Sequence, residues 1–227
     1  MTNSYPELLA DQVRHQIEAL TIDPARPLII SDADEVLLQF IVGLEGFLDR
    51  RGLWLDLQSF ALSGNVKDKE TGAPVPASNM PALLDDFFAT DLHTLDAVPD
   101  AASSLDALSA RAQILVLSNV PFEHRESRAA SLAEHGMDYP VIANVGLKGA
   151  AVRHLAAHIE APVFFLDDIP HNIASVARAH APTQLIHFIA DTRLAKLLGP
   201  AEHSHYHTTL WPDARTYIED HLSRQGF

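Results

Sequence analysis

Three short, continuous apolar runs stand out in the hydrophobic pattern, at residues 28–30, 113–117 and 163–166. The first contains two isoleucines and follows Pro27. A strand that is buried on both faces has such a run, whereas a strand with one face in water alternates apolar and polar residues. The pattern therefore predicts three buried strands of a parallel sheet.

Apolar residues at spacings of three and four predict helices around these strands. Asp34 and Ser118 are 84 positions apart, far more than a single crossover between strands needs, so the chain contains an insertion there. Strands that alternate with helices are typical of an α/β protein. The predicted helices cover residues 6–20, 36–50, 81–88, 100–111 and 213–222, and one more begins at residue 148.

Polar side chains follow each of the three predicted strands. Asp32 and Asp34 follow the first strand, Ser118 follows the second, and Asp167 and Asp168 follow the third. The carboxyl ends of parallel strands lie at one edge of a sheet, and open α/β sheets bind ligands at that edge. The sequence therefore predicts one site that contains all five side chains.

Lys148 opens a predicted helix and adds a cation beside these acids. Each residue also has an ordinary structural interpretation: Asp32 and Asp34 could be solvated loop acids, Lys148 a solvated helix-start lysine, and Ser118 the cap of a helix beginning near Glu123. The presence of all of them, in this order, favours the functional interpretation.

In this order the residues resemble the motifs of the haloacid dehalogenase-like superfamily of phosphohydrolases. The resemblance extends from residue 28 to about residue 189 and implies a Rossmann-like parallel sheet with helices on both faces. The position after the second aspartate is usually glycine in that superfamily and is Glu35 here, where the extra carboxylate could point into solvent or tune the site. The four motifs fall on Asp32 and Asp34, on Ser118, on Lys148, and on Asp167 with Asp168.

The resemblance also implies a cap domain between the first and second motifs, which would select the substrate by closing over the site. Here residues 36–98 would form a small, mainly helical cap, with a short hairpin near residues 67–76. Residues 1–35 and 99–227 would form the core. The alternative for residues 36–98 is a surface excursion that does not contact the site.

The chemistry of phosphoryl transfer matches these residue types. It needs a nucleophile, an acid for the leaving oxygen and positive charge near the transferred group. Asp32 is the candidate nucleophile and Asp34 the candidate acid and base, while Ser118 and Asn119 would bind the phosphoryl oxygens together with Lys148.

The four clustered carboxylates, Asp32, Asp34, Asp167 and Asp168, require a cation, and Mg²⁺ suits an all-oxygen site of this kind. All four are candidate metal ligands. Of Asp167 and Asp168, the resemblance to deoxyribonucleotidase-type members favours Asp168 as the direct ligand and Asp167 as the residue that orients it.

The predicted function is a Mg²⁺-dependent phosphatase that acts on a small phosphorylated metabolite through an aspartyl-phosphate. A phosphomutase uses the same two aspartates, and a 5′-nucleotidase would suit the paired acids and the small cap. A non-catalytic phospho-ligand-binding protein is the alternative from another class. A dehalogenase does not need the second acid, so the presence of Asp34 argues against that activity.

Composition limits the partners. The net charge of −14 disfavours nucleic acid, because a polyanion would be repelled. There are no cysteines, which excludes disulfides and thiolate metal sites, and no apolar stretch approaches the ~20 residues of a membrane span. The start lacks the pattern of a signal peptide, so a soluble, cytoplasmic protein is expected, and the oligomeric state is left open.

Histidines are frequent, at thirteen in the chain. His124 and His171 lie close to the second and fourth motifs, where they could contact substrate, but polar helix-start positions are the favoured interpretation of both. His203, His205 and His207 alternate and would share one side of an extended segment, as in a zinc-binding stripe. No acid completes that set at ligand spacing.

Overall fold

A six-stranded parallel sheet forms the centre of the protein. The computed structural model describes residues 8–227, so the first two positions of the helix predicted at residues 6–20 lie outside the described part. The strands lie in the order β5-β4-β1-β6-β7-β8, and every pair of neighbours is parallel. Their bounds are β1 Leu28–Ser31, β4 Gln113–Ser118, β5 Val141–Ala143, β6 Val163–Asp167, β7 Gln184–Phe188 and β8 Tyr206–Thr208.

The predicted α/β class is confirmed, and the three predicted strands are the central neighbours β4, β1 and β6. Both faces of the sheet are covered, which explains their continuous apolar runs. Ile29 of β1 points into one core, while Leu28 and Ile30 point into the other. The helices that contribute to the first core include α4 Ala101–Ser109, α5 Arg125–Glu134 and α9 Trp211–Gln225, and those that contribute to the second include α1 Asp11–Glu18, α6 Gly149–Ala156 and α7 Pro170–Ala179.

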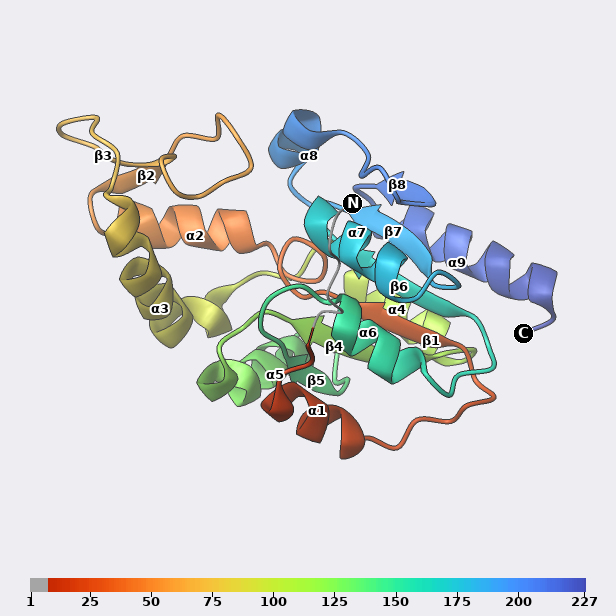
Figure 1. The fold of residues 1–227 in the computed structure, drawn as a ribbon. Coiled ribbons are helices and arrows are strands. Elements are labelled where there is room, and N and C mark those ends of the chain that lie inside the picture. The colour runs from red at the N-terminus through yellow and green to blue at the C-terminus, as the bar shows by residue number, and fades with distance from the viewer. Residues whose placement is uncertain (1–7) are drawn as a thin grey trace, which may run out of the picture.

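The long segment between β1 and β4 forms a group of helices with one hairpin (Figure 1). Phe87 contacts the rings of Phe40 and Phe47 at centroid distances of 5.3 and 5.2 Å, which joins its two longer helices. Short antiparallel strands form the hairpin. The elements are α2 Phe40–Asp49, β2 Leu53–Leu55, β3 Val66–Asp68, η1 Ala77–Asn79, α3 Met80–Asp91 and η2 Leu92–Thr94.

One prediction for this segment needs correction. The helix predicted from residue 36 begins at Phe40, because the backbone N–H groups of Leu37 and Leu38 both donate to the carbonyl of Ala33 in a tight turn. The turn predicted near residues 67–76 is present: residues 67 and 74 form an antiparallel bridge, and the Val75 N–H donates to the Val66 carbonyl at 2.8 Å. The longer pairing of β3 is with β2.

The two connections between this segment and the sheet run side by side. Leu38 and Ala97 form an antiparallel bridge, and the Gln39 N–H donates to the Asp96 carbonyl at 2.9 Å. The end of the segment also packs on α5, where the Ser131 hydroxyl donates to the Leu92 carbonyl at 3.0 Å. These contacts hold the segment next to the carboxyl ends of β1 and β4.

Two elements complete the set in residues 8–227: the short 3₁₀ helix η3 Phe122–His124, which follows β4, and α8 Thr192–Leu198, the last helix before β8. None of the helices in this range combines the length and the apolar character that a bilayer crossing requires.

Candidate active site

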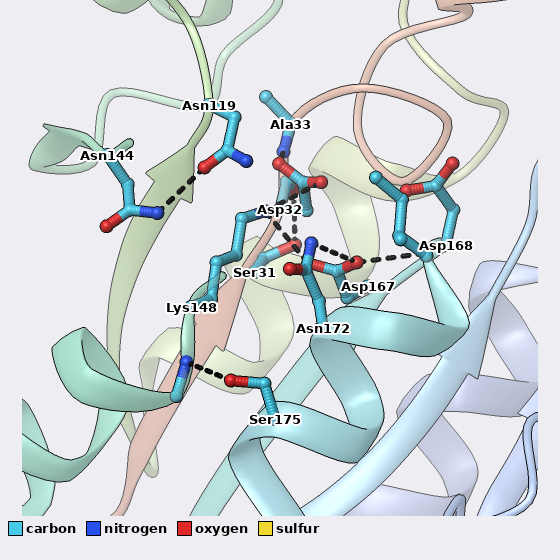
Figure 2. A network of polar contacts seen from close by, with 12 residues as sticks. Ser31, Asp32, Ala33, Asn119, Asn144, Lys148, Asp167, Asp168, Asn172 and Ser175 are labelled. Carbon is cyan, nitrogen blue, oxygen red and sulfur yellow. Dashed lines mark hydrogen bonds and ion pairs between the residues drawn. The ribbon is translucent and has the colours of Figure 1, made fainter. Parts of the chain in front are cut away.

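Asp32, Lys148 and Asp167 meet at the carboxyl ends of β1 and β6 (Figure 2). Ser31 pairs with Leu166 in the sheet register, so Asp32 leaves β1 beside the last residues of β6. The Asp32 N–H donates to the Leu166 carbonyl at 2.9 Å, which fixes the backbone at this point. The strand pairing thus explains why residues more than a hundred positions apart come together.

Lys148 is fully buried between the two acids. Its Nζ lies 2.7 Å from Asp32 Oδ2 and 2.8 Å from Asp167 Oδ2. Burial by itself would lower the pKa of Lys148, but the carboxylates of Asp167 and Asp32 outweigh it and hold the pKa above its ordinary value. Lys148 is therefore a permanent cation beneath the site.

The position of Lys148 depends on the close contact between α6 and α7. Lys148 immediately precedes α6, as predicted, and the N–H of Gly149 donates to Ser175 Oγ at 2.9 Å. A Cβ atom at position 149 would lie 2.6 Å from the Ser175 carbonyl oxygen, so only glycine permits this approach.

Asp167 uses its carboxylate entirely for contacts within the protein. Oδ1 accepts hydrogen bonds from the Ile169 N–H at 2.9 Å and from Asn172 Nδ2 at 3.0 Å, and Oδ2 binds Lys148. The side chain is fully buried. Asp167 therefore orients Lys148 and has little capacity left for a further ligand.

Asp168 is the acid of the pair that remains free to bind a cation. One oxygen from each of Asp32, Asp167 and Asp168 lies within 4.8 Å of the others, a spacing that a metal ion could bridge. Burial raises the pKa of Asp168 well above its ordinary value, and the charges of Asp167 and Asp32 raise it further. Burial raises the pKa of Asp32 to about 6 against the opposing charge of Lys148. A divalent cation would offset the cost of ionising these buried carboxyl groups, and carboxylate oxygens are ligands that such cations prefer.

Asp34 does not join this cluster, although it was predicted as a ligand with the other three. Its Oδ1 lies 2.7 Å from Nη2 of Arg128 on α5, while the cluster found among residues 8–227 contains the other three acids alone. Burial raises the pKa of Asp34, and the guanidinium of Arg128 opposes that rise. Asp34 also borders a cavity that is lined by Asp32, Asp168 and Asn119 among others, hereafter the cavity above Asp32.

Sequence reasoning missed Arg128. Its side chain is fully buried, and within residues 8–227 its guanidinium nitrogens have no aligned hydrogen bond apart from the ion-pair contact with Asp34. Arg128 shares a buried helix face with Ser131 and Leu132 at spacings of three and four. That spacing was the available signal, but an arginine close to a glutamate on an amphipathic helix is usually solvated.

Ser118 and Asn119 end β4 on the other side of Asp32. Ser118 is fully buried, and its Oγ has no hydrogen-bond partner among residues 8–227, so the hydroxyl does not cap a helix and can bind a ligand. Asn119 accepts a hydrogen bond from Asn144 at 2.8 Å and donates to the Gly146 carbonyl at 3.0 Å. These bonds hold the Asn119 amide at the border of the cavity.

Glu35 is neither solvated nor directly part of the acid cluster. Its φ of 57° lies in the left-handed region that favours glycine. Its carboxylate accepts hydrogen bonds from the N–H of Ile41 at 2.7 Å and of Asp191 at 2.8 Å, joining the start of α2 to the loop after β7. Burial raises the pKa of Glu35 to about 7 in spite of these two bonds.

The histidines contribute little to the site. His171 is exposed, and neither His171 nor His124 borders the cavity above Asp32. No metal-ligand group within residues 8–227 includes His203, His205 or His207. The alternating stretch has a structural use instead: its last member, His207, lies 3.1 Å from the buried His187, whose Nε2 is 2.9 Å from the Asp168 carbonyl oxygen.

Comparison with known proteins identifies the fold. No protein-family model and no curated protein matches the sequence. Solved structures do match: a conserved haloacid dehalogenase-like protein of unknown function from Agrobacterium tumefaciens is 19% identical, with a TM-score of 0.60 over 87% of this chain and 99% of that one. A putative beta-phosphoglucomutase from Thermotoga maritima is 12% identical, with a TM-score of 0.55 over 86% and 99%.

An L-2-haloacid dehalogenase from Xanthobacter autotrophicus, solved with chloropropionic acid covalently bound, is 15% identical, with a TM-score of 0.53 over 86% of this chain and 98% of that one. The chain therefore has the haloacid dehalogenase-like fold, as the sequence motifs indicated.

Proposed function

Starting from this haloacid dehalogenase-like fold, we propose that the protein is a Mg²⁺-dependent phosphohydrolase that acts on a small phosphorylated metabolite. The single observation that supports this most is the pairing of two acids with two buried cations at one strand end. Lys148 lies 2.7 Å from Asp32, and Arg128 lies 2.7 Å from Asp34. Such an arrangement provides a nucleophile and a separate acid and base beside the same cavity.

In the first half of the reaction a carboxylate oxygen of Asp32 attacks the phosphorus of the substrate. The bond from phosphorus to the leaving oxygen breaks, and Asp34 donates its proton to that oxygen, which leaves as an alcohol. The products of this half are an aspartyl-phosphate on Asp32 and an ionised Asp34.

In the second half Asp34 takes a proton from water as the water oxygen attacks the phosphorus. The bond between Asp32 and phosphorus breaks, inorganic phosphate leaves, and both acids return to their initial states. The raised pKa of Asp34 suits both tasks, because a catalytic acid and base works best with a pKa near the working pH.

Asp32 and Asp168 would hold the Mg²⁺, with Asp167 orienting Lys148 beside them. The ion would supply positive charge next to the phosphoryl oxygens. Lys148 adds a fixed positive charge, and the Ser118 hydroxyl and the Asn119 amide would donate hydrogen bonds to the same oxygens.

The test is hydrolysis of 4-nitrophenyl phosphate by the purified protein, with Mg²⁺ and after chelation. We expect hydrolysis with Mg²⁺, none after chelation, and none from the Asp32→Asn variant. Asp138→Asn, at an exposed acid in the loop before β5, is the matched control and should keep the wild-type rate. Asp34→Asn should slow alkyl phosphates more than aryl phosphates, since poor leaving groups need the proton most.

Full activity after chelation, or wild-type activity from Asp32→Asn, would contradict the proposal. Halide release from 2-chloropropionate without any phosphatase activity would assign the site to dehalogenation instead. Transfer of the phosphoryl group to a second hydroxyl of the substrate in preference to water would identify a mutase.

A further inference from the structure

The cavity above Asp32 has a strongly asymmetric lining. Its floor consists of the acids at the strand ends together with the Asn119 amide. Its volume is about 260 Å³, at the small end of the range for ligand sites. The remaining wall is apolar and is formed by Phe40, Ile41, Phe60, Leu62, Phe88 and Leu194, with Ile169 beside Asp168.

Most of this apolar wall belongs to the inserted segment. Phe40 and Ile41 begin α2, Phe88 lies on α3, and Phe60 and Leu62 come from the loop between β2 and β3. Phe40 and Phe88 are in contact, with ring centroids 6.3 Å apart. The inserted segment therefore contributes most of the aromatic and aliphatic part of the cavity wall.

No lysine, arginine or histidine lines this cavity within residues 8–227. Lys148 and Arg128 are fully buried beneath the floor and are occupied by Asp32, Asp167 and Asp34. A second anionic group of a substrate would thus meet an apolar wall with no cation to compensate it, at a large desolvation cost.

Neutral polar groups would also find few partners there. Within residues 8–227, Asn119 is the only neutral polar side chain in the lining, and its amide oxygen and one amide hydrogen are held by Asn144 and the Gly146 carbonyl. The remaining amide hydrogen is the one assigned above to the phosphoryl oxygens. The carboxylate of Glu35 accepts two backbone hydrogen bonds. A leaving group with several hydroxyls would lose more hydrogen bonds to water than it could regain.

We propose that the substrate is a phosphate monoester whose alcohol part is a small, uncharged apolar group, seated between Phe60, Leu62 and Phe88. This assignment rests on the proposed phosphohydrolase function and specifies its substrate class. A sugar phosphate, a nucleotide or a phosphorylated carboxylic acid is a poor substrate in consequence.

The test compares kcat/KM for methyl, ethyl, propyl and butyl phosphate with that for 3-carboxypropyl phosphate, which is close in size to butyl phosphate but carries a second anion. From ethyl to butyl the leaving alcohols differ little in basicity, so differences among these esters report binding in the cavity. We expect kcat/KM to rise roughly fourfold per buried methylene. The carboxylated ester should be at least tenfold poorer than butyl phosphate.

A pair of variants tests whether the alcohol part of the substrate binds against this apolar wall. Leu62→Lys places a cation in the apolar wall and should raise the ratio of carboxypropyl to butyl phosphate at least tenfold. Ser63→Lys adds the same charge at the next, exposed position, outside the lining, and should leave the ratio unchanged. Equal ratios in the two variants would overturn the assignment of this pocket to the alcohol part.

The outcomes also separate the two proposals. A flat alkyl series, or a preference for the carboxylated ester, with persistent hydrolysis of 4-nitrophenyl phosphate would overturn the substrate class and leave the phosphohydrolase proposal intact. Absence of hydrolysis for every ester would overturn both.

Discussion

At the scale of single residues, three of the four acids of the site form an ion pair with a particular neighbour. Asp32 and Asp167 share Lys148 and Asp34 faces Arg128, whereas Asp168 forms no ion pair within residues 8–227. A cation beside a carboxylate favours its ionised form, while burial disfavours that form. This division matches the proposed roles of Asp32 as an ionised nucleophile, Asp34 as the acid that changes its protonation, and Asp168 as a metal ligand.

Removal of the Arg128 charge should leave Asp34 without its partner. Arg128→Met keeps the length of the side chain, and we expect it to lower the free energy of unfolding by about 3 kcal/mol, as for a buried ion pair that loses one member. Urea unfolding measures this loss. Arg125→Met, on the same helix and partly exposed, should change stability by less than ~0.5 kcal/mol. The double variant Arg128→Met with Asp34→Asn should recover part of the loss, and equal losses for both single variants would contradict this account.

Glu35 should make stability depend on pH. Its pKa is about 7 in the folded protein against an ordinary 4.5, so the folded state binds more protons than the unfolded state between these values. The free energy of unfolding should therefore fall as pH rises from about 4.5 to 7, by up to about 3 kcal/mol relative to Glu35→Gln, which has no proton to lose. Urea unfolding across this range with metal chelated measures the difference, and parallel curves for the two proteins would refute the prediction. Glu202→Gln, at an exposed acid, is the control and should parallel the wild type.

At the scale of elements, the contact between α6 and α7 positions Lys148. Lys148 lies one residue before Gly149, which contacts Ser175 of α7. The same helix carries Asn172, whose side chain donates a hydrogen bond to Asp167. The two helices and β6 therefore form a single support for the ion pairs of Asp167. A change in the spacing of the helices would move Lys148 relative to Asp32.

Gly149→Ala should impair both stability and turnover. The added methyl group would lie 2.6 Å from a backbone oxygen of Ser175, so the helices must separate, at a cost of about 1–3 kcal/mol. Gly46→Ala, in α2, meets nothing closer than 3.7 Å and should instead stabilise the protein by roughly 0.5–1 kcal/mol. Thermal unfolding and turnover of 4-nitrophenyl phosphate measure the two effects, and a destabilisation of equal size in both variants would contradict the argument.

The elements also show what the sequence could predict. The strands before Asp32, Ser118 and Asp168 follow from continuous apolar runs, which depend only on local residue order, and the position of Lys148 follows from helical spacing. The start of α2 was predicted four residues early, because the turn at Leu37 depends on hydrogen bonds to Ala33. The contacts of Arg128 with Asp34 and of Glu35 with Asp191 join distant parts of the chain. Helical spacing can indicate that Arg128 is buried, but residue order does not identify the partner of either side chain.

At the scale of the whole molecule, the proposed chemistry and the proposed choice of substrate depend on different parts of the chain. The proposed catalytic residues all leave the parallel sheet, while the apolar wall of the cavity comes mostly from residues 40–88. The proposed division assigns the catalytic residues to a core, residues 1–35 and 99–227, and most of the apolar cavity wall to a cap, residues 36–98. A surface excursion that did not border the site would contribute no residues to this wall.

Removal of most of the inserted segment should separate the two functions experimentally. The connections meet at the bridge between Leu38 and Ala97, and η2 packs on α5, so a variant with residues 40–91 replaced by a flexible Gly/Ser linker keeps Leu92 and the surface it covers. This variant should still hydrolyse 4-nitrophenyl phosphate with Mg²⁺, at a reduced rate because water enters the site. Its kcat/KM should no longer rise from methyl to butyl phosphate, since the pocket that binds the alkyl chain is gone. If the folded variant, judged by circular dichroism, kept the alkyl preference of the parent, then selectivity would reside in Ile169 and Leu194 of the core.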